Sequence, residues 1–131
     1  MRVVFDTNIF ISALLFPGGR AEEALLRVIE GKDQLLVSRP LIHELVGVLA
    51  KKFSRNREEL AHVAVYLSEI AELVRPGRRL KVLDDEPDNR TIECAVTGRA
   101  AAIVTGDKAM LRLSEYKGIR IITLNDYLTY T

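Results

Sequence analysis

The sequence has one cysteine, no marked excess of charge of either sign, and no long apolar run. A single cysteine, Cys94, excludes a disulfide framework within the chain and is most simply a small buried apolar residue. Nineteen Lys and Arg balance eighteen Asp and Glu, so the basic excess typical of many nucleic-acid binders is missing. No segment reaches the roughly 18 apolar residues that a membrane span needs, and the amino terminus lacks a signal-peptide pattern. We therefore expect a cytoplasmic protein.

The composition is typical of a folded globular protein. Its 131 residues match the size of one compact domain, and we expect a single domain over residues 1–131. Apolar residues make up 48% of the chain and charged residues 28%, which is far from the composition of a disordered chain. There is no Cys and His spacing typical of zinc sites and no phosphate-binding glycine loop.

Short apolar runs rich in β-branched residues predict buried strands at 2–5, 34–37, 102–105 and 120–124. A weaker fifth candidate, 80–83, follows the turn residues Pro76 and Gly77. Helical patterns separate the strands, and this alternation predicts an α/β fold with a parallel sheet covered on both faces.

Apolar residues at helical spacing predict the helices. The clearest signals lie in a pair of helices within 40–74, where Pro40 fits a first turn and Asn56 with Glu59 forms a capping box. The other predicted helices begin near Asn8, contain residues 24–29, and span 87–97, 108–113 and 126–130.

Acidic residues follow two predicted strands. Asp6 closes the first strand in VVFDTN, and Asp107 follows the fourth in AIVTGD. Ligands of such sheets bind at the carboxyl ends of the strands, where two carboxylates repel unless a cation lies between them. Two ordinary roles stay open. Asp107 also fits a helix N-cap, and Thr7 and Asn8 can satisfy Asp6 in a turn.

Two further acids lie on predicted helices. Glu44 falls within or beside an apolar stripe, and Asp88 lies four residues before Ile92 at the start of another. Either acid can also have a structural role, because Glu44 at a stripe edge reaches water and Asp88 in a first turn is favoured by the helix dipole. Carboxylates without a zinc-type ligand set suit Mg²⁺ or Mn²⁺.

Two basic stretches, KKFSRNR at 51–57 and RPGRRLK at 75–81, are candidates for phosphate contacts. Neither has interleaved aromatic residues, which favours an ordinary solvated surface.

Four motifs in order, VVFDTNIFISALL, RPLIHELVGVL, DDEPDNRTIECAVTGRA and AAIVTGDKAML, resemble those of PIN-domain proteins, in particular toxin components of toxin-antitoxin systems. The resemblance implies that Asp6, Glu44, Asp88 and Asp107 are the four catalytic and metal-binding acids. Thr7, Asn8 and Thr105 match polar neighbours that assist them. Asp84, Asp85 and Glu86 lie just upstream of the third acid, and Asp88 is preferred because Ala95 then matches a small helical residue of the family.

The resemblance also implies a three-layer α/β/α sandwich with a five-stranded parallel sheet in the order 3-2-1-4-5. It implies a metal-dependent ribonuclease with RNA as substrate and a small antitoxin protein as partner, and it leaves open whether one ion or two bind. One alternative is an inactive module of the same fold that acts through protein or RNA binding. Another is an aspartyl-phosphate enzyme or receiver domain, which would want a second Asp where the chain has Asn8.

The helical pair within 40–74 carries more apolar positions than one small sheet face covers, so we expect a symmetric homodimer. The candidate contact residues are Leu49, Phe53, Val63, Tyr66 and Leu67. The alternative is that an antitoxin helix covers this surface on a monomer.

Overall fold

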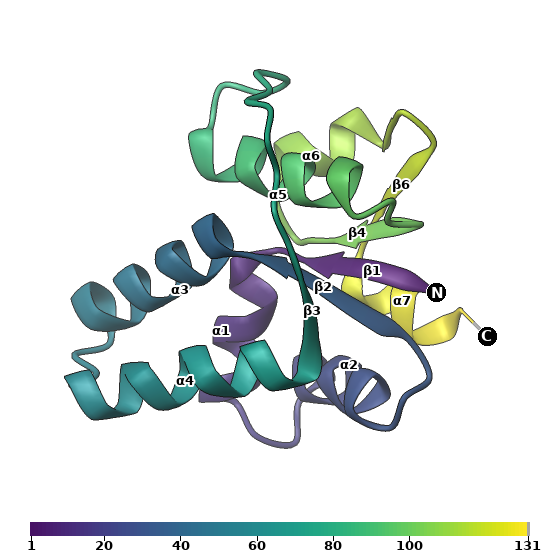
Figure 1. Cartoon of the computed structure of the whole chain (residues 1–131). Helices are drawn as coiled ribbons and strands as arrows, with labels where there is room; N and C mark the ends of the chain where they lie inside the picture. The colour runs from purple at the N-terminus through teal and green to yellow at the C-terminus, as the bar shows by residue number, and fades with distance from the viewer. Residues whose placement is uncertain (131) are drawn as a thin grey trace.

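The computed structural model describes residues 1–130, in which a six-stranded sheet lies between two layers of helices (Figure 1). The strands follow the order β3-β2-β1-β4-β6-β5, and only β5 runs antiparallel to its neighbour. In chain order the strands are β1 (Arg2–Phe5), β2 (Gln34–Ser38), β3 (Ala71–Val74), β4 (Ala102–Val104), β5 (Glu115–Tyr116) and β6 (Ile119–Ile122).

The helices cover both faces of the sheet. In chain order they are α1 (Thr7–Leu15), α2 (Arg20–Ile29), α3 (Arg39–Lys52), α4 (Arg57–Ile70), α5 (Glu86–Thr97), α6 (Lys108–Leu113) and α7 (Leu124–Thr129). Helices α5 and α6 lie on one face, and α1, α2, α4 and α7 lie on the other. Helix α3 follows β2 at the carboxyl end of the sheet and contacts α1, α4 and α5 (Figure 1).

Alternation of side chains along the strands divides the core between the two faces. Val3 and Phe5 of β1 pack in the cluster that includes α1, α2 and α7, whereas Val4 packs with Ile92 of α5 in the second cluster. All three β1 residues are at most 1% exposed. Strands buried on both faces explain why these runs are apolar without alternation in the sequence.

The predicted three-layer fold and the predicted order of the five parallel strands are confirmed, with β6 as the fifth member. The predicted strand at 80–83 is wrong, because the third strand is β3, directly after α4. The apolar stripe of α4 continues at helical spacing as far as Val74, so the sequence pattern hides the end of the helix at Ile70. Pairing of β3 with β2 stabilises the extended form of this segment.

A sixth, antiparallel strand was not expected from the sequence. β5 and β6 form a hairpin whose two turn residues, Lys117 and Gly118, both have positive φ, at 50° and 82°. Two positive φ values match the turn type whose twist suits a hairpin, and glycine adopts one of them without strain. In the sequence, the Lys117-Gly118 pair is the feature that indicates this turn.

Local helix signals agree well with the structure. The capping box of Asn56 and Glu59 is present, with the Asn56 side chain accepting from the Glu59 backbone N–H at 2.9 Å. Two of the residues considered for a dimer contact are inside the chain's own core, because Leu49 and Leu67 are each 2% exposed. Among residues 1–130, no helix combines the length and the apolar character that crossing a membrane requires.

Candidate metal centre

The carboxyl ends of β1 and β4 are joined by one buried hydroxyl. Thr105 is fully buried, and its side chain donates to Asp6 Oδ2 at 2.7 Å. The same Thr105 oxygen accepts the backbone N–H of Asp107 at 3.0 Å. Asp6, which is 5% exposed, also receives the Thr7 hydroxyl on Oδ1 at 3.3 Å. Thr105 therefore ties together the strand ends that carry the first and fourth acids.

Asp107 has both of the roles predicted from the sequence, because it caps a helix and also belongs to the cluster of acids. It is the N-cap of α6, where its Oδ1 accepts the Met110 backbone N–H at 3.0 Å. It also lies beside α5, where one oxygen each of Asp85, Asp88 and Asp107 falls within 4.8 Å of the others. Capping uses one oxygen of Asp107, so the carboxylate has a second oxygen for a ligand.

Asp88 lies at the middle of the acids. It is 5% exposed, and its buried Oδ2 has no hydrogen-bond partner within residues 1–130. Burial, the largest cause, and the negative charges of Asp107, Asp85, Asp6 and Glu44 together raise the pKa of Asp88 to about 7. A buried carboxylate without a donor, facing four other acids, is costly when ionised.

Glu44 approaches from α3. Its position follows from Leu41 and Leu45, which are both buried and fix this helix against the sheet, while Glu44 itself is half-buried. Burial raises the pKa of Glu44, and the charges of Asp6 and Asp85 add to this rise, whereas a hydrogen bond from Thr7 opposes it. The structure thus brings Glu44 next to the acids at the strand ends.

All four acids considered from the sequence therefore converge, and the structure adds a fifth, Asp85. Asp85 is the N-cap of α5 but makes no capping hydrogen bond, which leaves its carboxylate facing Asp88 and Asp107. Asp84 is exposed and does not contribute to the pKa rise of Asp88. The sequence feature that indicates this fifth acid is the three-residue spacing between Asp85 and Asp88, which places both side chains on the same side of the first turn of a helix.

The supporting residues differ in placement. Thr7 and Thr105 are buried and donate to Asp6, as described above. Asn8 is exposed, and its side chain makes no hydrogen bond within residues 1–130. Its predicted assistance to the acids stays a prediction.

The segment before Asp85 is held by buried polar side chains of α5. Asn89, which is fully buried, accepts the backbone N–H groups of Val82 and Leu83 at 3.0 and 2.9 Å and donates to Leu83 O at 2.8 Å. Glu93 accepts the Leu80 N–H at 2.7 Å. Side chains of α5 therefore satisfy backbone groups that the predicted strand at 80–83 would have paired, and they fix the loop that carries Asp85.

The donor set fits a hard divalent cation. It consists of carboxylate oxygens with threonine hydroxyls behind them, and Mg²⁺ and Mn²⁺ prefer such oxygen ligands. The unpartnered Oδ2 of Asp88 is the position where a cation would satisfy a buried atom that no donor of residues 1–130 reaches. Asp6, Glu44, Asp85, Asp88 and Asp107 are the residues that could hold it.

The chain matches the PIN domain family over residues 2–109 and belongs to this family. It is similar to an uncharacterised protein of Methanocaldococcus jannaschii, with 29% identity over 119 residues that cover 88% of this chain and 76% of that protein.

Two solved structures share the fold. A chain in the crystal structure of VapBC2 from Rickettsia felis, bound to a DNA fragment from its promoter, has a TM-score of 0.67 and 16% identity, with 94% of this chain and 98% of that chain covered. A chain of VapBC-1 from nontypeable Haemophilus influenzae has a TM-score of 0.65 and 18% identity, with 95% and 99% covered.

Proposed function

We propose that this PIN-domain protein is a nuclease that hydrolyses RNA phosphodiester bonds with Mg²⁺ or Mn²⁺ held by Asp6, Glu44, Asp88 and Asp107. The observation that carries the proposal is the buried Asp88 oxygen without a donor at the centre of converging acids. Keeping such a group in the fold has a free-energy cost that a bound cation removes. Family membership supports the same activity.

A bound divalent ion supplies Lewis-acid stabilisation of phosphate charge and lowers the pKa of a water molecule. The chain's own residues hold the metal-binding carboxylates in fixed positions. Thr105 holds Asp6 and the backbone of Asp107 at once, so the ends of β1 and β4 keep a fixed spacing. Both histidines, His43 and His62, are exposed, and neither contributes to the pKa shifts of the acidic site. Catalysis in this proposal therefore depends on oxygen ligands and not on a side-chain nucleophile.

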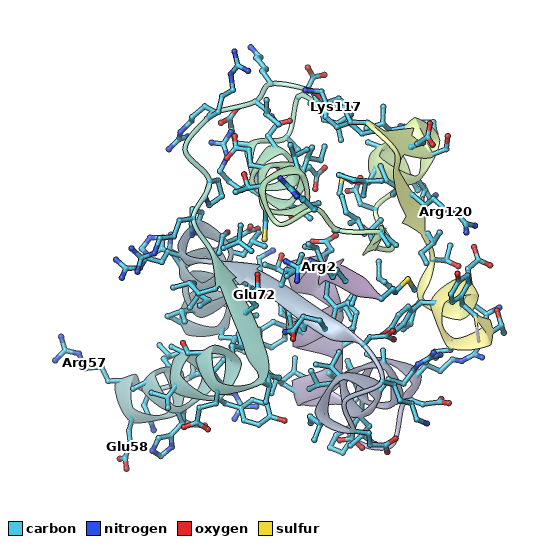
Figure 2. The ribbon with its side chains drawn as sticks, turned by 45° about the vertical axis from the view of Figure 1, so that its right-hand side comes forward. Arg2, Arg57, Glu58, Glu72, Lys117 and Arg120 are labelled. Atoms are coloured by element: carbon cyan, nitrogen blue, oxygen red, sulfur yellow. The ribbon has the colours of Figure 1, made fainter. Side chains whose placement is uncertain are left out.

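Cleavage of a labelled RNA tests this proposal. The wild type is expected to cleave it in Mg²⁺ or Mn²⁺ and not in EDTA, and Asp6→Asn is expected to abolish cleavage while the fold is kept. Glu58→Gln is the matched control, because Glu58 is an exposed acid at the free end of α4, away from the site (Figure 2). Full cleavage by Asp6→Asn contradicts the mechanism. RNA binding without cleavage by the wild type favours the inactive binding module.

The biological role in this proposal is that of a toxin with an antitoxin partner. Its support is the likeness to chains of two VapBC toxin-antitoxin complexes, together with an apolar groove on the face opposite α5. Two adjoining pockets of about 630 and 260 Å³ share Leu14, His62 and Val63, from α1 and α4. Val65 lines the larger pocket and is 56% exposed, so the groove has apolar surface for a protein partner or a second copy.

Light scattering at micromolar concentration tests self-association. A homodimer is expected for the isolated chain, and Val65→Glu is expected to yield a monomer because it places a charge in the groove. Val65 is chosen rather than Leu67, one of the predicted contact residues, because Leu67 is 2% exposed and a charge there would unfold the chain. A monomeric wild type contradicts the dimer and favours a groove that a small antitoxin occupies.

A further inference from the structure

Arg39 and Arg75 lie at the carboxyl end of the sheet, the end that also carries Asp6. The paired residues of β1, β2 and β3 place the residues after these strands side by side, because Val4 pairs with Leu36 and Ser38 pairs with Val74. Arg39 follows β2 and Arg75 follows β3, while Asp6 follows β1. Neighbouring strands lie about 4.8 Å apart, so Arg75 is roughly 10 Å from Asp6 along this edge.

Arg39 and Arg75 line one pocket. It has a volume of about 240 Å³, and its other walls are Pro40, Val74 and Pro76. Proline fixes its own backbone φ, and Val74 is buried, so the walls of this pocket are stiff. Two arginines that line one pocket supply the positive charge and the hydrogen-bond donors that a phosphate anion takes.

Neither arginine is neutralised. Both are exposed, and neither has an ion pair or a side-chain hydrogen bond within residues 1–130. The other end of the sheet differs, because Arg2 of β1 reaches Glu72 of β3 at 2.8 Å and the two side chains lie together in Figure 2. Arg55 in the 51–57 stretch is likewise paired, with Glu59 at 2.9 Å. Arg39 and Arg75 therefore keep free guanidinium groups, within residues 1–130, at the same end of the sheet as Asp6.

We propose that the pocket between Arg39 and Arg75 binds a backbone phosphate of the RNA strand, next to the phosphate that is cleaved at the acids. This inference rests on the proposed ribonuclease function. Arg75 follows a strand that lies two strand spacings from the strand that Asp6 follows. RNA carries one negative charge on each backbone phosphate, so one phosphate can contact the arginines while a neighbouring phosphate lies at the metal centre.

The pocket also explains how a chain of net charge +1 attracts nucleic acid. Phosphate contacts supply affinity without sequence information, and a local pair of arginines is enough to orient a strand. The 75–81 loop continues the positive charge with exposed Arg78, Arg79 and Lys81. This loop leads to Asp85, so the basic and acidic parts of the proposed path are connected along the chain.

Salt-dependent binding of a short unstructured RNA tests the inference. Affinity is measured by fluorescence anisotropy over a range of salt concentrations, in the Asp6→Asn background with Mg²⁺ present, where the proposed function prevents turnover. Each phosphate contact on a single strand contributes about 0.7 to the slope of log affinity against log salt. The Arg39→Ala/Arg75→Ala double variant is expected to reduce that slope by about 0.7, because the pocket holds one phosphate.

The matched control is Arg57→Ala/Lys117→Ala, which removes the same charge at two residues that do not line this pocket, one at the start of α4 and one at the β5–β6 turn (Figure 2). Its slope is expected to equal that of the Asp6→Asn parent. If the wild type cleaves the RNA but both double variants show the same dependence of log affinity on log salt, the pocket assignment is wrong, while the proposed nuclease function still stands. Loss of duplex-DNA affinity with an unchanged RNA slope also overturns it. A wild type that neither binds nor cleaves RNA overturns the proposed function and this inference together.

Discussion

Replacement of Asp88 by asparagine is expected to stabilise the metal-free protein, and to do so only at high pH. The pKa of Asp88 rises from an ordinary 3.8 to about 7 in the folded chain. The folded state therefore binds a proton more tightly than the unfolded state does, so stability falls as pH increases from about 4 to about 7 and stays low above that. A rise of this size corresponds to at most about 4 kcal/mol.

The measurable gain is smaller than this limit. Salt and solvent screen the repulsion from exposed Asp85, and the new amide of Asp88→Asn is itself incompletely hydrogen-bonded at the buried position. We expect Asp88→Asn to raise the free energy of unfolding by about 2 kcal/mol at pH 8 and to leave it nearly unchanged at about pH 3, which lies below both pKa values of Asp88. Urea unfolding in EDTA at both pH values measures this difference.

Two comparisons make the test specific. Glu58→Gln removes an exposed acid and is expected to have no effect at either pH. Saturating Mg²⁺ at pH 8 is expected to stabilise the wild type and to have a smaller effect on Asp88→Asn, because the ion binds the folded state through Asp88. An equal gain at about pH 3 and pH 8, or no gain at pH 8, would refute the argument that repulsion and burial destabilise the ionised Asp88.

Four further substitutions have definite expectations. Thr105→Val keeps the shape but removes the hydroxyl that orients Asp6, and calorimetry is expected to show Mn²⁺ affinity about 10- to 100-fold weaker. Asn89→Ala removes three buried hydrogen bonds and is expected to lower the free energy of unfolding by about 3 kcal/mol in urea. Gly98→Ala is expected to cost about 1 to 3 kcal/mol, because a Cβ there lies 2.7 Å from a leucine methyl of β2. Gly47→Ala, within α3 and with nothing inside 4 Å, is expected instead to stabilise by up to about 1 kcal/mol.

The parts of the fold that follow from local pattern could be predicted from the sequence. Strands β1, β2 and β4 are apolar on both faces, so short runs identify them, and Asp6 and Asp107 are visible as the acids that follow β1 and β4. Cys94 was expected to be a buried apolar residue, and it is fully buried. The Asn56 capping box involves only a few neighbouring residues, which is why its prediction is confirmed.

The remaining parts depend on contacts between distant residues. Strand β3 is extended because it pairs with β2, although its own residues continue the helical spacing of α4. The 80–83 segment is a loop because Asn89 and Glu93 satisfy its backbone from a neighbouring helix. The sequence prediction names Asp88 rather than Asp85 as the third acid of the site, whereas the fold places both beside Asp107. A choice based on spacing alone cannot anticipate that two candidates share one site.

The central claim is that these converging acids hold a divalent cation through the buried oxygen of Asp88. The most direct measurement is a crystal structure of the wild type with Mn²⁺, in which anomalous scattering locates the ion. The account predicts an anomalous peak among the acids, with Asp88 Oδ2 within about 2 to 2.5 Å of it as expected for oxygen ligands of such cations. A structure at saturating Mn²⁺ in which Asp88 Oδ2 has no ion, or in which the ion lies elsewhere on the chain, would contradict it.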